Sequence, residues 1–180
     1  MASSKEKGGK GLVQVFTGNG KGKTTAALGT ILRAAGHGLR IFIVFFMKGD
    51  YAHGEYASLT KLPDVNIASF GLRRLVDPAN VDPEEIKQAK LALEAAREAT
   101  INGKYDLVVL DEVNVAVEYK LIELDDVIDL VNRKPENVEL ILTGRYAHNR
   151  LIEKADLVTE MVKVKHPFDK GINARKGIEY

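Results

Sequence analysis

Cysteine and tryptophan are both absent from this chain of 180 residues, and neither sign of charge dominates it. Without cysteine there is no disulfide scaffold, no zinc–thiolate or iron–sulfur centre, and no catalytic thiol. Lys and Arg number 26 against 25 Asp and Glu, which gives a net charge of +1. Such a balance produces no molecule-wide field that attracts nucleic acid, so we expect no nucleic-acid partner.

Long apolar runs are missing as well. Residues 1–10 are polar and rich in Gly and Lys, and no run of about 18 apolar residues occurs anywhere. We therefore expect a cytoplasmic protein with no membrane partner, and a flexible tail over residues 1–10. Residues 11–180 are too few for two domains of typical size and show no repeat or composition break. They are expected to form a single domain.

The chain does contain an alternation of apolar, strand-like runs with helical stretches. Strands are expected at 12–17, 40–46, 65–70, 106–111, 138–143 and 157–162, and helices at 23–35, 55–61, 123–133, 149–155 and after Asp82. The helix after Asp82 has the clearest start, because Pro83 occupies its first turn and Glu85 completes a capping box. Strands that alternate with helices imply right-handed crossovers and a mostly parallel sheet. The sequence thus predicts a three-layer α/β/α domain.

A glycine-rich loop joins the first expected strand to the first expected helix. It reads Thr-Gly-Asn-Gly-Lys-Gly-Lys-Thr-Thr over residues 17–25 and matches the phosphate-binding pattern G-x-x-x-x-G-K-[ST], with Thr17 in place of the first glycine. The glycines let backbone N–H groups turn toward an anion, and the helix N-terminus adds partial positive charge. We expect a P-loop NTPase-like fold of the RecA-like kind.

Each residue type in this loop has an expected task. Lys23 supplies a positive charge to the outer phosphates, and the hydroxyl of Thr24 can bind Mg²⁺; these two are the predicted catalytic residues. The predicted nucleotide-binding set is Gly18, Asn19, Gly20, Lys21, Gly22, Lys23, Thr24 and Thr25.

An apolar run at residues 107–110 ends in Asp111 and Glu112. In P-loop proteins an acid after a buried strand holds Mg²⁺ directly or through water. The sequence therefore predicts a metal site made by Thr24 with Glu112 or Asp111, and it leaves the choice between the two carboxylates open.

Further short motifs follow the loop along the chain. They are Arg33–Gly38, Lys48-Gly49, Gly54–Tyr56, Leu110–Glu112, Thr143–Arg145, Val164–Gly171 and Lys176–Tyr180. From about Gly11 onward, their order resembles the ATP:corrinoid adenosyltransferases of the CobA/BtuR type. In that family the loop also carries Thr instead of the first Gly.

The resemblance implies an activity and a set of partners. Reduced corrinoid, as Co(I), would attack the 5′ carbon of ATP and release triphosphate, in the synthesis or salvage of adenosylcobalamin. ATP would be the co-substrate with Mg²⁺, and the nucleotide would lie in the loop with reversed polarity. A homodimer and an electron-donating flavoprotein reductase are implied as well.

Three further positions are expected at this site. Arg33 resembles a nucleotide-contacting position, with a surface salt bridge as the alternative. Arg145 follows Gly144 at the carboxyl end of a strand, where open α/β sheets bind ligands. Phe70 is a candidate for the corrinoid side of the site, with ordinary packing as the alternative.

The chain departs from the family's pattern in two ways. Some members have an N-terminal helix that helps to close the corrinoid site, whereas here polar residues 1–10 precede the first expected strand. Some members also carry a Trp near the segment that is 69–72 here, and this chain has none.

Two other functions are alternatives. A P-loop small-molecule kinase would need a base for a substrate hydroxyl and usually an Arg-rich lid, and no second Arg-rich segment is present. A non-catalytic, nucleotide-dependent DNA-binding or switch module would need a basic face, which the near-zero net charge does not favour.

Overall fold

The computed structural model describes residues 9–49 and 54–179, so residues 1–8 of the expected N-terminal tail lie outside the described residues. Its strands are β1 (Val13–Thr17), β2 (Ile41–Phe45), β3 (Val65–Ser69), β4 (Leu107–Asp111), β5 (Glu139–Thr143) and β6 (Leu157–Glu160). They form one sheet in the order β3-β2-β4-β5-β1-β6. Every neighbouring pair is parallel. The expected P-loop NTPase-like α/β class is confirmed, with a sheet that is parallel throughout.

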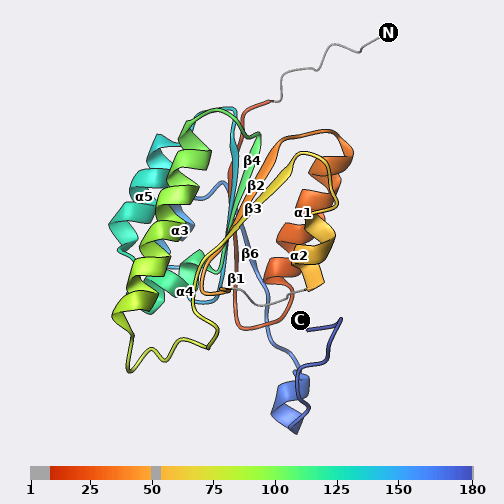
Figure 1. Ribbon diagram of the computed structural model, residues 1–180, viewed down its shortest axis with the longest axis vertical. Helices are drawn as coiled ribbons and strands as arrows, with labels where there is room; N and C mark the ends of the chain where they lie inside the picture. Colours follow the sequence, from red (N-terminus) through yellow and green to blue (C-terminus); the bar gives the residue numbers. More distant parts are fainter. Residues whose placement is uncertain (1–8, 50–53, 180) are drawn as a thin grey trace.

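Helices cover both faces of this sheet (Figure 1). One face carries α1 (Lys23–Gly36) and α2 (Gly54–Leu59), and the other carries α3 (Pro83–Ile101), α4 (Val113–Glu118) and α5 (Leu124–Arg133). A further helix, α6 (Asn149–Lys154), buries Leu151 in the same core as α3 and α5. The result is the expected three-layer arrangement.

The apolar run in β2 shows why the sheet is covered on both sides. Successive side chains of a strand point to opposite faces, so a strand with two buried faces needs apolar residues throughout. Ile43 packs in the core beneath α1 and Val44 in the core beneath α3, and neither is exposed at all. The continuous apolar run is therefore explained by burial on both faces.

Helix α3 begins as its sequence predicts. The Asp82 side chain accepts a hydrogen bond from the Glu84 N–H at 2.8 Å, and Glu85 accepts one from the Asp82 N–H at 3.0 Å. These bonds satisfy N–H groups that have no partner within a helix. With Pro83 in the first turn, the chain is directed into a helix at this point.

Apart from shifts of one or two residues in other element ends and the short turn at Pro167–Lys170, the structure differs from the sequence-based expectations at two places. Helix α4 was not predicted, because its valines at 113, 115 and 117 are β-branched and have low helix propensity. Strand β6 ends at Glu160 rather than at 162, because the next residue turns along the phosphate loop, where the Met161 carbonyl accepts the Gly20 N–H at 2.6 Å.

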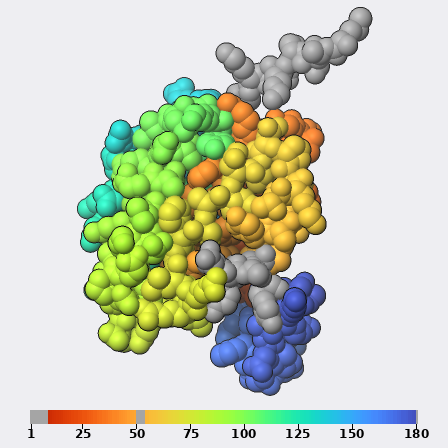
Figure 2. Space-filling model, viewed as in Figure 1, coloured from red at the N-terminus to blue at the C-terminus, as the bar shows by residue number. Residues whose placement is uncertain are grey.

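The carboxyl ends of the strands meet at one edge of the sheet, the lower edge in Figure 1. There β5 separates β1 from β4, so two strand spacings, about 10 Å, lie between the loop after β1 and the acids after β4. The chain leaves the same edge through a short 3₁₀ turn, η1 (Pro167–Lys170), and Figure 2 shows residues 163–179 standing out from the body of the domain. No helix in the described ranges is long and apolar enough to cross a bilayer.

Candidate nucleotide and metal site

In the loop between β1 and α1, two glycines stand where no side chain would fit. A Cβ atom at Gly18 would lie 2.5 Å from the Met161 carbonyl oxygen, and one at Gly20 would lie 2.7 Å from the same atom. Gly18 and Gly22 also have φ angles of 95° and 112°, which residues with side chains rarely adopt. Gly18 and Gly20 are therefore required by the packing of the loop against the segment that follows β6, and Gly22 by its backbone angle.

Lys23 is the first residue of α1 and closes the loop from inside. Its Nζ donates hydrogen bonds to the carbonyl oxygens of Gly18 at 2.9 Å and Gly20 at 2.7 Å, and the residue is only 7% exposed. Burial lowers the pKa of Lys23, although the carboxylate of Glu112 counteracts this. Helix α1 has no side-chain cap, so the N–H groups of its first turn are available to an anion. This end of α1 is suited to binding phosphate groups.

Asp111, the last residue of β4, is completely buried and has a partner for each oxygen. Its Oδ1 accepts a hydrogen bond from the Thr143 hydroxyl at 2.7 Å, and its Oδ2 forms an ion pair with Lys48 Nζ at 2.8 Å. Burial disfavours the charged form of Lys48, but the carboxylates of Asp111, Glu55 and Glu112 together outweigh this and raise the pKa of Lys48. Asp111 thus forms a buried ion pair at the sheet edge.

Glu112, the next residue, differs from Asp111 in burial and in the contacts of its carboxylate. It is half-buried, and its carboxylate makes no hydrogen bond or ion pair within the described part of the chain. Burial raises its pKa, as does the negative charge of Asp111, whereas the positive charges of Lys48, Lys23 and Arg145 oppose the increase. Glu112 is therefore the available carboxylate near the positively charged end of the phosphate loop.

The loop after β5 lies against the phosphate loop. The Thr17 hydroxyl accepts a hydrogen bond from the Ala147 N–H at 3.2 Å, which joins the two loops. This contact gives a physical reason for Thr in place of the first glycine of the motif. Arg145, in the same loop, is exposed and lowers the pKa of Lys23, so its charge acts at this site.

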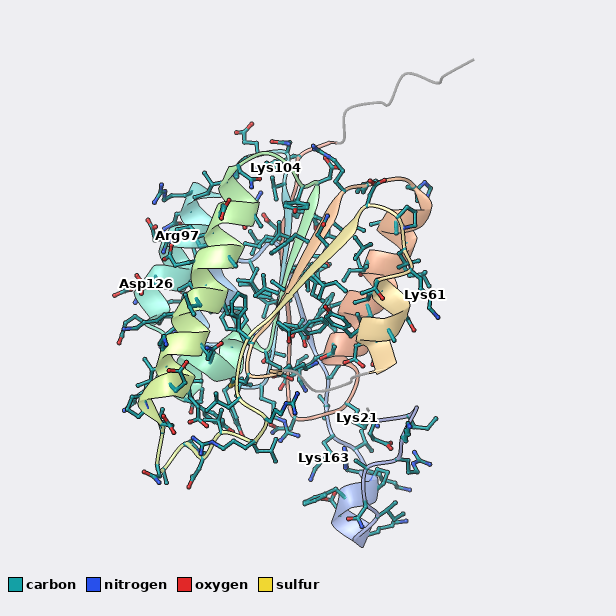
Figure 3. All side chains as sticks on the ribbon, in the orientation of Figure 1. Lys21, Lys61, Arg97, Lys104, Asp126 and Lys163 are labelled. Carbon is teal, nitrogen blue, oxygen red and sulfur yellow. The ribbon has the colours of Figure 1, made fainter. Side chains whose placement is uncertain are left out.

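The remaining predicted residues are distributed unevenly. Asn19, Lys21 and Thr25 are exposed on the loop or the first turn of α1, and Thr24 is half-buried beside Lys23. In Figure 3 Lys21 lies beside the C-terminal segment, and its Nζ pairs with Glu179 Oε1 at 2.7 Å.

Two predicted residues lie away from this cluster. Arg33 is exposed in the last turn of α1, about 15 Å along the helix axis from Lys23. Phe70 follows β3, four strands and about 19 Å from β1 across the sheet, and packs against the core on the α3 side. Their roles remain predictions.

Lys48 and Thr143 were not identified as site residues from the sequence. Both stand at the carboxyl ends of apolar strands, Lys48 after β2 and Thr143 at the end of β5. A polar residue at such a position was the available signal, because the carboxyl ends of parallel strands converge on one edge.

The protein residues fit a magnesium ion only if a substrate supplies further ligands. The described residues contain no group of three or more His, Cys, Asp or Glu side chains that could hold a metal. Mg²⁺, however, is commonly bound by one or two protein oxygens together with substrate phosphates and water. The Thr24 hydroxyl and the unpaired Glu112 carboxylate provide oxygens of this kind.

Comparison with known proteins shows to which family the chain belongs. Residues 9–180 match the family model described as ATP:corrinoid adenosyltransferase BtuR/CobO/CobP. The corrinoid adenosyltransferase of Escherichia coli (strain K12) is 37% identical over 171 residues, which cover 95% of this chain and 86% of the relative. The corrinoid adenosyltransferase of Pseudomonas aeruginosa is 37% identical over 174 residues, covering 95% and 84% of the two chains. The corrinoid adenosyltransferase CobA of Salmonella typhimurium is 36% identical over 186 residues, which cover 95% of this chain and 86% of the relative. The chain belongs to the ATP:corrinoid adenosyltransferase family.

Proposed function

We propose that this protein transfers the 5′-deoxyadenosyl group of ATP to the cobalt of a reduced corrinoid. The electron pair of Co(I) forms the bond to the 5′ carbon while the bond from that carbon to the triphosphate oxygen breaks. Cobalt is thereby oxidised to Co(III), and the triphosphate leaves with the bonding electrons. No protein nucleophile is needed, which is consistent with a chain that lacks cysteine.

The observation that best supports this proposal is that the N-terminal end of α1 is suited to binding phosphate groups. The chain that carries this end belongs to the corrinoid adenosyltransferase family. Lys23 Nζ lies within the loop, 2.7 Å from the Gly20 carbonyl oxygen, and the first turn of the helix offers free N–H groups. Positive charge placed where a leaving group develops negative charge lowers the barrier to reaction. The loop and Lys23 would hold the triphosphate and stabilise it as it departs.

Mg²⁺ is part of the same proposal. A bound magnesium ion would neutralise further charge on the triphosphate. Thr24 and Glu112 are the residues proposed to hold it, because both oxygens of Asp111 are already paired with Thr143 and Lys48. Arg145 is proposed to add positive charge on the side of the β5–α6 loop.

The corrinoid side and the assembly rest on the family resemblance alone. We propose that Phe70 lines the corrinoid site and that Arg33 contacts the nucleotide. A homodimer and an electron-donating flavoprotein reductase are proposed on the same ground.

The test is product formation. The protein is incubated with ATP, Mg²⁺ and chemically reduced corrinoid, and the absorbance spectrum is followed in the dark and after illumination. The proposal predicts an adenosyl–cobalt product that light destroys, at a rate that depends on protein concentration. If no light-sensitive product forms above the protein-free control, the proposed activity is wrong.

A further inference from the structure

The Thr143 hydroxyl connects the two acidic residues at the end of β4. It donates its proton to Asp111 Oδ1 at 2.7 Å and accepts the Glu112 N–H at 3.0 Å, and Thr143 is completely buried. A hydroxyl has a single proton to donate, so donation to the carboxylate leaves its lone pairs for the N–H. Thr143 thereby fixes the Glu112 backbone relative to the Asp111 side chain.

Lys48 holds the other side of this arrangement. Its Nζ pairs with Asp111 Oδ2 at 2.8 Å, lies 3.5 Å from Glu55 Oε1, and sits 4.7 Å from the centre of the Phe45 ring. A buried carboxylate needs such a partner to remain charged. With Oδ2 paired to Lys48, Asp111 presents Oδ1 to Thr143 in one orientation.

The Glu112 backbone requires this support. Its φ angle is 65°, a left-handed conformation that is unfavourable for a residue with a side chain. The Glu112 carbonyl accepts the N–H groups of Val115 and Ala116, which begin α4, and its own N–H is bonded to Thr143. The direction in which the Glu112 carboxylate points therefore depends on the hydrogen bond from the Glu112 N–H to Thr143. It also depends on Asp111 and Lys48, which orient the Thr143 hydroxyl.

We propose that Thr143, Asp111 and Lys48 are positioning residues that hold the Glu112 carboxylate toward the phosphate loop, where it binds the magnesium ion of Mg-ATP. This inference rests on the proposed function, because it takes Glu112 as the metal ligand. Thr143 and Lys48 act through Asp111 and the Glu112 backbone and do not themselves touch the metal or the nucleotide.

The experiment measures ATP binding by calorimetry without corrinoid, at increasing Mg²⁺ concentration and in EDTA. Thr143→Val removes the hydroxyl at nearly constant volume, and Thr143→Ser keeps it. Loss of a residue that orients a metal ligand typically weakens metal binding about 10–100-fold. We expect Thr143→Val to raise the half-saturating Mg²⁺ concentration at least about tenfold, and Thr143→Ser to stay within about twofold of the original protein. ATP binding in EDTA should be the same for all three.

Thr100→Val is the matched control. Thr100 is also completely buried, and its hydroxyl donates to the Ala96 carbonyl at 2.7 Å within α3, far from the sheet edge. This variant removes a buried hydroxyl without touching the Glu112 network and should leave the Mg²⁺ requirement unchanged. Lys48→Met provides a second test if Thr143→Val does not fold, and it should shift the Mg²⁺ requirement in the same direction.

Three results would overturn the inference. The first is a folded Thr143→Val or Lys48→Met protein with an unchanged Mg²⁺ requirement. The second is an equal loss of ATP binding in EDTA, which would indicate general damage to the loop. The third is a Glu112→Gln protein with an unchanged Mg²⁺ requirement, which would also remove the metal role from the proposed function. If the Mg²⁺ shifts occur as expected but no adenosyl–cobalt product forms, the positioning role stands and the proposed reaction fails.

Discussion

Lys21 in the phosphate loop and Glu179 in the C-terminal segment form an ion pair with 2.7 Å between Nζ and Oε1. Glu179 also accepts hydrogen bonds from the Arg175 side chain and backbone. Among the described residues, the Lys21–Glu179 pair is the one side-chain hydrogen bond or ion pair that joins residues 163–179 to the rest of the molecule. The segment packs poorly otherwise, since Val164 is 85% exposed and Phe168 is 75% exposed.

We therefore expect Glu179→Gln to loosen the C-terminal segment. Trypsin should cleave after Lys170, Arg175 or Lys176 faster in this variant than in the original protein. Glu153→Gln, at an exposed position of α6, is the control and should leave the cleavage rate unchanged. Equal cleavage rates for all three proteins would show that the ion pair does not restrain the segment.

The same contact should respond to salt and to acid. The Arg175 and Lys21 side chains hold the pKa of Glu179 well below its usual range. Glu179 therefore stays charged in mild acid. Its contribution to holding the C-terminal segment is fully present above the ordinary glutamate pKa of 4.5, and it is lost only as the pH falls through the lower pKa of the folded state. Because the pair is partly exposed, salt at about 1 M should screen it and speed cleavage near neutral pH.

Lys23→Ala should separate activity from folding. The Lys23 Nζ donates hydrogen bonds to the carbonyl oxygens of Gly18 and Gly20 in the loop, so the thermal unfolding midpoint should change little. Turnover should fall about 100-fold or more, as is typical when a group that stabilises developing charge is removed. Lys61→Ala, at an exposed position after α2, is the matched control. Near-normal turnover in Lys23→Ala would contradict the role assigned to this residue.

Asp111→Asn and Glu112→Gln should differ in the stability that they cost and in how far they raise the Mg²⁺ requirement. Removing the Asp111 charge leaves Lys48 without its closest partner, and breaking a buried ion pair in this way typically costs about 3 kcal/mol of unfolding free energy. Glu112→Gln removes a charge whose burial is unfavourable, as the raised pKa of Glu112 indicates, so stability should be maintained or increase.

Urea unfolding and Mg²⁺ titration of ATP binding together test this pair. Glu112→Gln should show the larger increase in Mg²⁺ requirement, and Asp111→Asn the larger loss of stability. The reverse pattern would make Asp111 the metal ligand.

Gly20, in the phosphate loop, and Gly29, in α1, give a contrasting pair of alanine variants. A Cβ atom at Gly20 would lie 2.7 Å from the Met161 carbonyl oxygen, so Gly20→Ala should displace the loop and weaken ATP binding. Gly29 is exposed in the middle of α1 with open space around it, and Gly29→Ala should stabilise the protein by about 0.5–1 kcal/mol. Calorimetry with ATP and thermal unfolding measure the two effects, and unchanged ATP binding by Gly20→Ala would contradict the close packing of the loop.

Much of the fold could be predicted from local patterns. The glycine-rich loop, the capping box at Asp82 and the apolar β2 run each depend on residues that are neighbours in the sequence, and each predicted an element that the structure contains. The acids after β4 were also expected to act with the phosphate loop, because P-loop proteins hold Mg²⁺ with an acid that follows a buried strand.

The contacts that orient the acids could not be predicted in the same way. Lys48 and Asp111 meet because β2 and β4 are neighbours in the sheet, although β3 lies between them in the sequence. The left-handed backbone of Glu112 leaves no local sign, since glutamate ordinarily avoids it. The pairing of Lys21 with Glu179 likewise depends on how the end of the chain returns to the loop.

The most direct measurement of the central claim is phosphorus NMR of ATP incubated with the protein, Mg²⁺ and reduced corrinoid. Attack at the 5′ carbon releases all three phosphates as one piece, whereas a kinase or ATPase cleaves at the γ-phosphorus and releases ADP. We predict intact triphosphate in step with adenosylated corrinoid, little ADP, and slow hydrolysis of ATP alone. Stoichiometric ADP or free phosphate without triphosphate would contradict the account and indicate a phosphotransfer enzyme.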